Sequence, residues 1–159
     1  GYAGQSDSCA MDEQAASDAT FSILIALLSG HNLVHDVGYL EAGLTTSPEM
    51  IVLSDEIIAQ MRFFMAGMTI DAETLALDVI DEVGPGGDFL MAEHTLKHFR
   101  QMHQPALWSR QRMNDWQAAG GKRLGQRLRD KTVGIMESHQ PAPLPGKVKD
   151  EIERILRQK

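Results

Sequence analysis

The stretch HNLVHDVG, at residues 31–38, decides the fold that we expect for this chain. Leu33, Val34 and Val37 are residue types that favour extended backbone, and glycines stand at positions 30 and 38. The stretch is the only good strand candidate in the sequence. A buried strand must pair its backbone N–H and C=O groups, so we expect sheet neighbours that lie outside these residues.

Helices are predicted on both sides of this strand. Asp12 can cap a helix whose apolar residues continue to Leu28, and Ser47 followed by Pro48 is a second start signal, because proline at the first helical position loses no hydrogen bond. The expected helices cover about 13–28, 48–66, 72–83, 92–102, 106–119, 121–139 and 146–157, with stops at Gly30, Gly67 and the Gly-Pro-Gly-Gly of 84–87. The chain is therefore expected to be mainly α, with one or two short β-strands.

Composition places the chain in the ordinary globular class. Hydrophobic residues make up 43% and charged residues 23% of the 159 residues. The longest apolar run, 23–28, is far too short to cross a bilayer, and we see no secretory signal. The single cysteine, Cys9, cannot form an internal disulfide. We therefore expect a cytoplasmic protein without a membrane partner.

Charge is distributed unevenly along the chain. Residues 1–93 contain 16 Asp and Glu but one Lys or Arg, Arg62, whereas residues 97–131 contain nine Lys and Arg but two acidic residues. The basic segment lacks the aromatic interleaving of a nucleic-acid reader, so we expect no nucleic-acid partner. We expect the two halves to pair electrostatically, within a chain or between subunits.

Three phrases carry a family resemblance: SDSCAMDEQAA at 6–16, HNLVHDVGYLEAGLTTSPEMIVLSDEI at 31–57 and DAETLALDVIDEVGPGGDFLMAEHTLKHFR at 71–100. The sequence resembles the trimethylamine:corrinoid methyltransferase family over about residues 2–157. The resemblance implies the carboxy-terminal part of a (β/α)8 TIM barrel. Residues 1–104 would be its last β/α units, and residues 105–159 a carboxy-terminal helical extension.

The same resemblance implies a reaction and a partner. Members move a methyl group from a tertiary or quaternary amine, such as trimethylamine or a betaine, to the Co(I) of a corrinoid (cobalamin) carried by a separate protein. This is the methylamine metabolism of a methanogenesis-related family, and the methyltransferase itself binds no cofactor directly. Members that use trimethylamine carry pyrrolysine in a loop resembling 6–12, where Cys9 is the nearest residue here, so the chain resembles a member without pyrrolysine.

Most of such a barrel is missing from these residues, so the isolated chain is predicted to be inactive. The alternative is a non-catalytic helical module for oligomerisation or for binding the corrinoid protein. Apolar faces that normally meet the rest of a barrel favour association, and we expect a homo-oligomer.

Candidate site residues follow from the barrel, which places its chemistry at the carboxy ends of strands. The expected catalytic residues are His35 and Asp36, and a positively charged methyl donor would be bound by anionic or aromatic side chains. The expected substrate-binding residues are Ser6, Asp7, Tyr39 and Glu41. Alternatively, His35 and Asp36 hold the shape of their loop, and Ser6 and Asp7 form a turn that enters the helix.

A metal site has only a weak signal in the sequence. His94 and His98 stand four residues apart on an expected helix, near Asp88 and Glu93. The spacing permits metal ligation, but it is not the His-Glu-x-x-His pattern, and a third ligand would have to come from elsewhere. We therefore expect a solvated or interface helix face and no metal ion.

Overall fold

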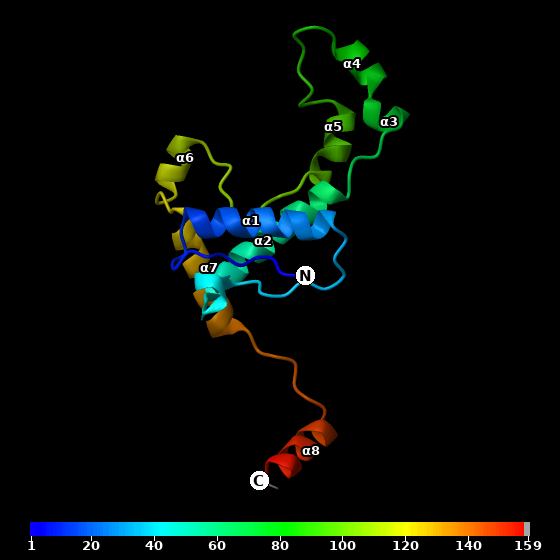
Figure 1. Cartoon of the computed structure of the whole chain (residues 1–159). Helices are drawn as coiled ribbons and strands as arrows, with labels where there is room; N and C mark the ends of the chain where they lie inside the picture. Colours follow the sequence, from blue (N-terminus) through cyan, green and yellow to red (C-terminus); the bar gives the residue numbers. More distant parts are fainter. Residues whose placement is uncertain (158–159) are drawn as a thin grey trace.

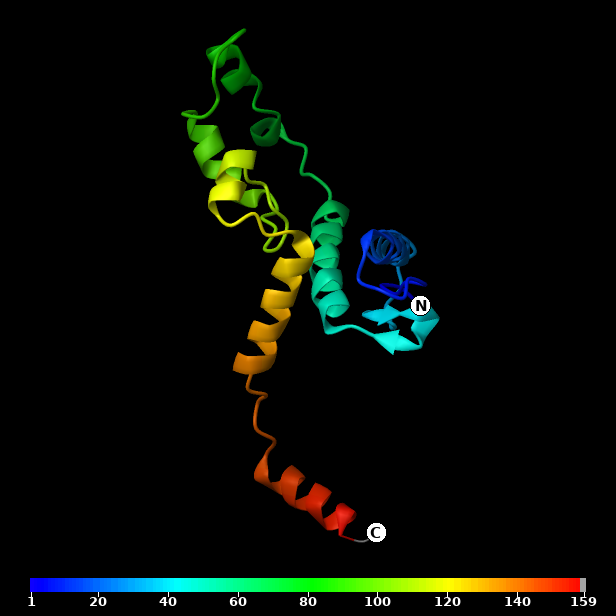
Figure 2. The same cartoon turned by 90° about the vertical axis from the view of Figure 1, so that its left-hand side faces the viewer.

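The computed structural model describes residues 1–157, and its centre is a packed group of three helices. These are α1 (Glu13–Leu28), α2 (Pro48–Met65) and α7 (Leu124–Ser138). Helix α2 lies between the other two and packs against both (Figures 1 and 2). The buried apolar residues form one core cluster: Ala15, Ala19, Ile23 and Ala26 of α1, Met50, Leu53 and Ile57 of α2, Leu128 of α7 and, outside these helices, Ala3 and Leu40.

Helix α1 begins where the sequence predicts. The Asp12 carboxylate accepts a hydrogen bond from the Ala15 backbone N–H at 3.0 Å, which satisfies one of the free donors of the first turn. Alanines occupy most of its buried face: Ala15 and Ala19 are fully buried. Small side chains on this face let α2 approach α1 closely. The predicted helix 13–28 is confirmed.

Helix α2 also begins at its predicted cap. The Ser47 hydroxyl accepts a hydrogen bond from the Met50 N–H at 3.2 Å, and Pro48 occupies the first turn. The helix ends at Met65, two residues before Gly67, whose φ of 71° stops a right-handed helix. Both predicted ends are confirmed.

The expected strand at 31–38 is wrong as a continuous strand. Only His35 of that stretch makes a β-bridge, a parallel one with Tyr2. The stretch 31–38 has hydrogen-bond partners on one edge, in the amino-terminal segment. Asp36 has a φ of 76°, which interrupts the extended backbone. The strands that form are β1 (Tyr39–Leu40) and β2 (Thr45–Thr46), which pair antiparallel around the 3-10 turn η1 (Glu41–Gly43).

The predicted helix at 72–83 is two short helices. These are α3 (Ala72–Leu75) and α4 (Leu77–Val83), separated at Ala76, whose φ of 47° lies in the left-handed region. Gly84 then ends α4 as predicted. The helix expected at 92–102 is present as α5 (Glu93–His98) followed by the 3-10 turn η2 (Phe99–Gln101).

The predicted helix 106–119 is wrong over its first half. It forms only as α6 (Met113–Ala118), and Trp108 lies in the preceding loop. Buried Glu56 of α2 accepts hydrogen bonds from the N–H groups of Ala106 and Leu107, at 2.8 and 3.3 Å. Arg127 of α7 donates to the Leu107 carbonyl at 2.7 Å. The Leu107 carbonyl, which a helix beginning at residue 106 would have used, is thus bound by α7, whereas the N–H groups that Glu56 binds would have had no partner within such a helix.

Beyond α7, the linker that contains residues 141–145 leads to α8 (Gly146–Leu156), which lies away from the three packed helices (Figure 1). Every residue of α8 is exposed. Among residues 1–157, no helix combines the length and the apolar character needed to span a lipid bilayer. The division of the chain between residues 104 and 105 stays a prediction.

Candidate functional site

The predicted site residues lie on two segments that run side by side, 1–8 and 33–42. Backbone hydrogen bonds join them in the direction of a parallel pair and its continuation. Among them are His35 N–H to Gly1 O, Ala3 N–H to His35 O, Gly38 N–H to Gly4 O, Ser6 N–H to Tyr39 O and Glu41 N–H to Ser8 O, these five between 2.9 and 3.2 Å. The structure therefore brings the loop that contains Ser6 and Asp7 next to the loop that contains the other four predicted residues.

Alternate residues of the first segment form hydrogen bonds with α1 and with its N-cap residue, Asp12. The three contacts are the Gly4 N–H to the Ser22 hydroxyl at 3.0 Å, the Ser6 hydroxyl to the Asp18 carboxylate at 2.6 Å, and the Ser8 hydroxyl to the Asp12 carboxylate at 3.0 Å. Because residues on an extended segment alternate sides, the intervening Asp7 is exposed, as is Cys9. Ser6 is 2% exposed, so its side chain here holds the loop.

His35 and Asp36 form a pair at the surface. The His35 Nδ1 atom lies 2.7 Å from the Asp36 Oδ1 atom, and the two side chains are 54% and 24% exposed. The ring of Tyr2 meets the His35 imidazole edge-on, with 4.2 Å between the ring centroids. This pair can orient the imidazole and can present negative charge to a cation.

Tyr39 and Glu41 complete the second loop. Tyr39 is half-buried in β1, whereas Glu41 is exposed and accepts a hydrogen bond from the Thr45 hydroxyl at 2.6 Å. Glu41 and Ala42 both have positive φ, 52° and 51°, which makes the turn tight. The Ala42 N–H donates to the Ser6 carbonyl at 3.3 Å, so the two loops meet here as well.

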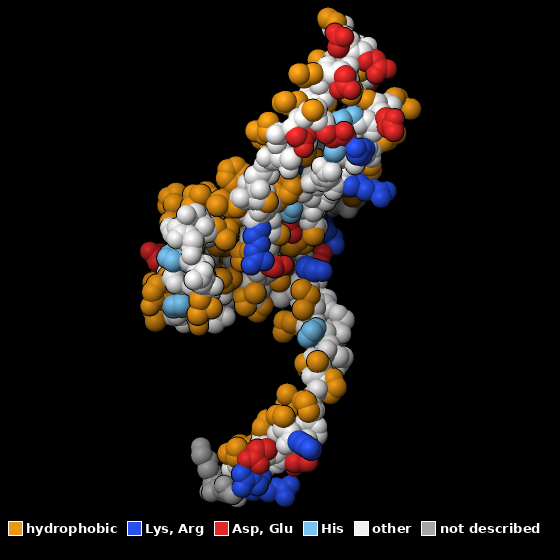
Figure 3. All heavy atoms as spheres, turned by 90° about the vertical axis from the view of Figure 1, so that its right-hand side faces the viewer, with side chains coloured by type: hydrophobic (Ala, Val, Ile, Leu, Met, Phe, Trp, Pro, Cys, Tyr) orange, Lys and Arg blue, Asp and Glu red, His pale blue; other side chains and the backbone are white. Residues whose placement is uncertain are grey.

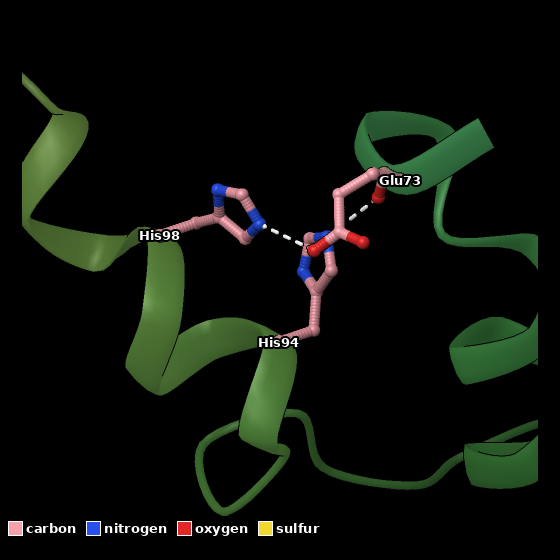
Figure 4. Close-up of side chains that lie close together, drawn as sticks. All are labelled: Glu73, His94 and His98. Atoms are coloured by element: carbon pink, nitrogen blue, oxygen red, sulfur yellow. Dashed lines mark hydrogen bonds and ion pairs between the residues drawn. The ribbon is translucent and has the colours of Figure 1, made fainter. Parts of the chain in front are cut away.

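A second cluster of ionisable side chains lies on α3 and α5 (Figure 4), which are away from the amino-terminal segment and the three packed helices (Figure 1). The Glu73 Oε1 atom lies 2.6 Å from Lys97 Nζ and 3.0 Å from His98 Nε2, and the His94 Nε2 atom lies 2.8 Å from the Glu73 carbonyl oxygen. Hydrogen bonds from Lys97 and then His98 lower the pKa of Glu73 to about 2. In return, the bond to Glu73 raises the pKa values of Lys97 and His98.

This second cluster borders a hollow of about 1270 Å³ between the helices α3, α4 and α5. Six carboxylates line it: Asp71, Glu73, Asp78, Glu82, Asp88 and Glu93. Acidic side chains gather visibly at this end of the molecule (Figure 3). None of the site residues expected at 6–7 and 35–41 lines this hollow.

Comparison with known proteins gives one consistent family. Residues 2–159 match the trimethylamine methyltransferase (MTTB) family. The trimethylamine methyltransferase of Desulfitobacterium hafniense (strain DSM 10664 / DCB-2) is 33% identical over 153 residues, which is 96% of this chain and 31% of the relative. The trimethylamine methyltransferase of Methanosarcina barkeri (strain Fusaro / DSM 804) is 32% identical over 95% of this chain and 30% of the relative.

A relative named for another substrate has nearly the same identity. The glycine betaine methyltransferase of Desulfitobacterium hafniense (strain Y51) is 32% identical over 158 residues, covering 98% of this chain and 33% of the relative. The chain therefore spans about a third of the length of these relatives. Because the match extends over nearly every residue and includes both loops of the candidate site, the chain belongs to the trimethylamine methyltransferase family.

Proposed function

We propose that this chain is the carboxy-terminal part of a corrinoid-dependent methyltransferase that takes a methyl group from a tertiary or quaternary amine. The family match over residues 2–159 is the observation that carries the proposal. Relatives named for trimethylamine and for glycine betaine are about equally similar to the chain, so the donor class is a methylated amine. The methyl acceptor is the Co(I) corrinoid of a separate partner protein.

We further propose that the complete protein is a TIM barrel and that this chain supplies its last β/α units. Support comes from segments 1–6 and 33–39, which are joined by parallel backbone hydrogen bonds and connected through α1. A parallel pair needs such a crossover, and the strand–helix–strand repeat is the building unit of the barrel. Leu33 is 79% exposed and Tyr2 68% exposed, as expected of side chains whose barrel neighbours are elsewhere.

The proposed roles of the site residues follow from the positive charge of the donor. The carboxylates of Asp36 and Glu41 would attract the ammonium group, and the ring of Tyr39 would offer a cation–π contact. His35, held by Asp36 at 2.7 Å, would orient the donor. Ser6 and Asp7 would shape and charge the neighbouring loop. Methyl transfer depends mainly on holding the ammonium carbon in line with the acceptor, which is a task of positioning.

We propose that the isolated chain does not catalyse this reaction, because most of the barrel that would enclose the donor is not among these residues. The test adds the chain, reduced corrinoid protein and either trimethylamine or glycine betaine, and follows the absorbance of methylated cobalt. We expect no methylation above the background without the chain. Methylation that depends on the chain and is lost in Asp36→Asn would disprove inactivity while supporting the assigned site.

The substitution Asp36→Asn is chosen because Asp36 has a φ of 76°. Asparagine tolerates this left-handed conformation about as well as aspartate, so the substitution removes the charge and keeps the loop. In a longer protein that includes the rest of the barrel, Asp36→Asn should weaken methyl transfer, whereas Asp81→Asn on exposed α4 should not. Equal activity of both variants would exclude Asp36 from the site.

A second candidate function is an interaction module, and one observation favours it. Helix α8 carries Val148, Ile152 and Ile155 at helical spacing on one face, and these side chains are 43% to 55% exposed. An apolar stripe in water favours association with another copy or with the corrinoid protein. Light scattering after size-exclusion chromatography tests this: a monomer at all concentrations would exclude self-association.

We propose the cytoplasm as the location of the protein. The exposed thiol of Cys9 fits this reducing compartment.

A further inference from the structure

The structure supplies the third metal ligand that the sequence pattern lacked. Glu73 of α3 lies against His94 and His98 of α5, although it precedes them by 21 and 25 residues (Figure 4). One ligand-type atom from each residue, an imidazole nitrogen or a carboxylate oxygen, lies within 4.8 Å of the other two. The two imidazoles face each other with 4.3 Å between ring centroids, because residues four apart share one helix face.

This spacing is close to that of a tetrahedral metal centre. Zinc binds imidazole nitrogen and carboxylate oxygen at about 2.0–2.2 Å, which puts neighbouring ligand atoms about 3.3 Å apart. The His98 Nε2 and Glu73 Oε1 atoms are 3.0 Å apart, so this edge needs little change. His94 Nε2 contacts the Glu73 carbonyl oxygen at 2.8 Å and would turn from that oxygen toward the ion. The ligand atoms already lie within 4.8 Å of one another, so the adjustment of His94 would be a rotation of its side chain.

Electrostatics at this end of the molecule favour a cation. The hollow beside the cluster is lined by six carboxylates but by only one lysine, Lys97. Lys97 Nζ lies 2.6 Å from Glu73 Oε1, where it already acts as a positive partner of the carboxylate. Its side chain is 61% exposed, so it can move into water when a divalent ion takes its place.

We propose that Glu73, His94 and His98 form a zinc site with three protein ligands and a fourth position open to water in the acidic hollow. Two imidazoles and one carboxylate are a donor set that zinc accepts, with the fourth position left to water or a small ligand. The bound ion would cross-link α3 to α5 and thereby hold together the two ends of the segment 76–92 that connects them. The expectation of a bare, solvated helix face is replaced by this proposal, which is independent of the methyltransferase proposal.

The competing explanation is an ion network without metal, in which Glu73 is neutralised by Lys97 and His98. The two explanations differ in the effect of Lys97→Met. If zinc and Lys97 compete for the Glu73 carboxylate, the substitution tightens zinc binding. If the cluster is only an ion network between Glu73, Lys97 and His98, Lys97→Met should not bind zinc.

The experiment uses the full chain without a histidine tag, freed of metal with a chelator and titrated with Zn²⁺ against a chromophoric competitor. We expect one zinc ion per chain. Glu73→Gln, His94→Gln and His98→Gln should each weaken binding by at least about tenfold, since even the loss of a residue that only supports a ligand costs about 10–100-fold. His139→Gln, an exposed histidine just after α7, is the matched control and should leave binding unchanged.

Two further readouts report on coordination and on the loop. Co²⁺ in place of Zn²⁺ should give the visible absorbance of a four-coordinate ion, and zinc should slow backbone hydrogen exchange over residues 72–98 in the wild type but not in His98→Gln. Absence of zinc uptake by both the wild type and Lys97→Met would overturn the proposal. So would undiminished uptake by the variant that carries both histidine substitutions. Circular dichroism of each variant confirms that lost binding is not lost folding.

Discussion

Ser6→Ala separates the two roles that Ser6 can have, because the structure makes it an anchor of the site loop. Its hydroxyl donates to the Asp18 carboxylate at 2.6 Å and accepts from the Ser8 N–H at 3.0 Å, and the residue is 2% exposed. Alanine removes both bonds. A substrate-binding serine would change affinity for the donor and leave stability alone, whereas an anchoring serine must change stability.

The expected loss of stability follows from these two bonds. A hydrogen bond to a charged group contributes about 1.5–3 kcal/mol, and a neutral one about 0.5–1.5 kcal/mol. Asp18 is half-buried, so water can replace part of the first bond. We therefore expect Ser6→Ala to lower the free energy of unfolding by about 2–3 kcal/mol.

Urea unfolding followed by circular dichroism measures this free energy by linear extrapolation. Asp7→Asn is the matched control, because Asp7 is the exposed neighbour, and it should change stability by less than about 0.5 kcal/mol. A double-mutant cycle with Asp18→Ala should show a coupling energy of at least about 1 kcal/mol. Stability of Ser6→Ala equal to that of Asp7→Asn would refute the anchoring role.

Three other substitutions test the fold, two by the same urea unfolding assay and one by thermal unfolding at different pH values. Glu56→Ala should cost about 2–4 kcal/mol, because it leaves the N–H groups of 106–107 without their acceptor; a loss below about 0.5 kcal/mol would contradict this. Gly38→Ala should cost about 2–4 kcal/mol, since φ is 94° and an added Cβ would lie 2.3 Å from Ile51; an unchanged midpoint would show that the loop is not built this way. The pKa of Asp12 is lowered from its ordinary value of 3.8, chiefly by the backbone hydrogen bond that caps α1. The stabilisation that the ionised Asp12 gives to the fold is therefore present above pH 3.8 and is lost as the pH falls through the lowered pKa. Asparagine caps the helix without titrating. Asp12→Asn should therefore lose less thermal stability than the wild type between about pH 6 and about pH 3. Equal losses would contradict that assignment.

The features that the sequence predicted well are those with short-range causes. Asp12 and Ser47 each reach an N–H three residues ahead, so their caps are encoded in a few adjacent residues. The stops at Gly67 and Gly84 likewise depend on the conformational freedom of single residues. The family resemblance depended on long phrases and is confirmed over nearly the whole chain.

The features that the sequence predicted poorly depend on distant partners. HNLVHDVG has strand-forming residues, but the positive φ of Asp36 interrupts the extended backbone, and the residues 1–8 that pair with this stretch lie far from it in the sequence. A single bridge therefore forms, at His35. Residues 106–112 belong to a segment that the sequence predicts as helical, yet Glu56 of α2 and Arg127 of α7 bind the backbone of residues 106–107 from two other helices. Glu73 could not be found as a partner of His94 from spacing alone, because two turns lie between them. The turn after α4 has a glycine signal at Gly84, but the turn between α3 and α4 is made by Ala76, a left-handed residue without such a signal.

The structure shows where the acidic and basic segments of the sequence form ion pairs with each other. The ion pairs shown between the acidic segment 1–93 and the basic segment 97–131 both belong to Glu73, which meets Lys97 and His98. The expected pairing of the two segments is thus concentrated at one end of the molecule, beside a hollow with five further carboxylates. Lys97 cannot balance six negative groups, and neither can Lys97 together with a protonated His98, so a field that attracts cations persists there. A divalent ion would supply in one place the charge that the chain's own basic segment leaves uncompensated, and for this reason the acidic end, and not the loops around His35, is where metal binding should be sought.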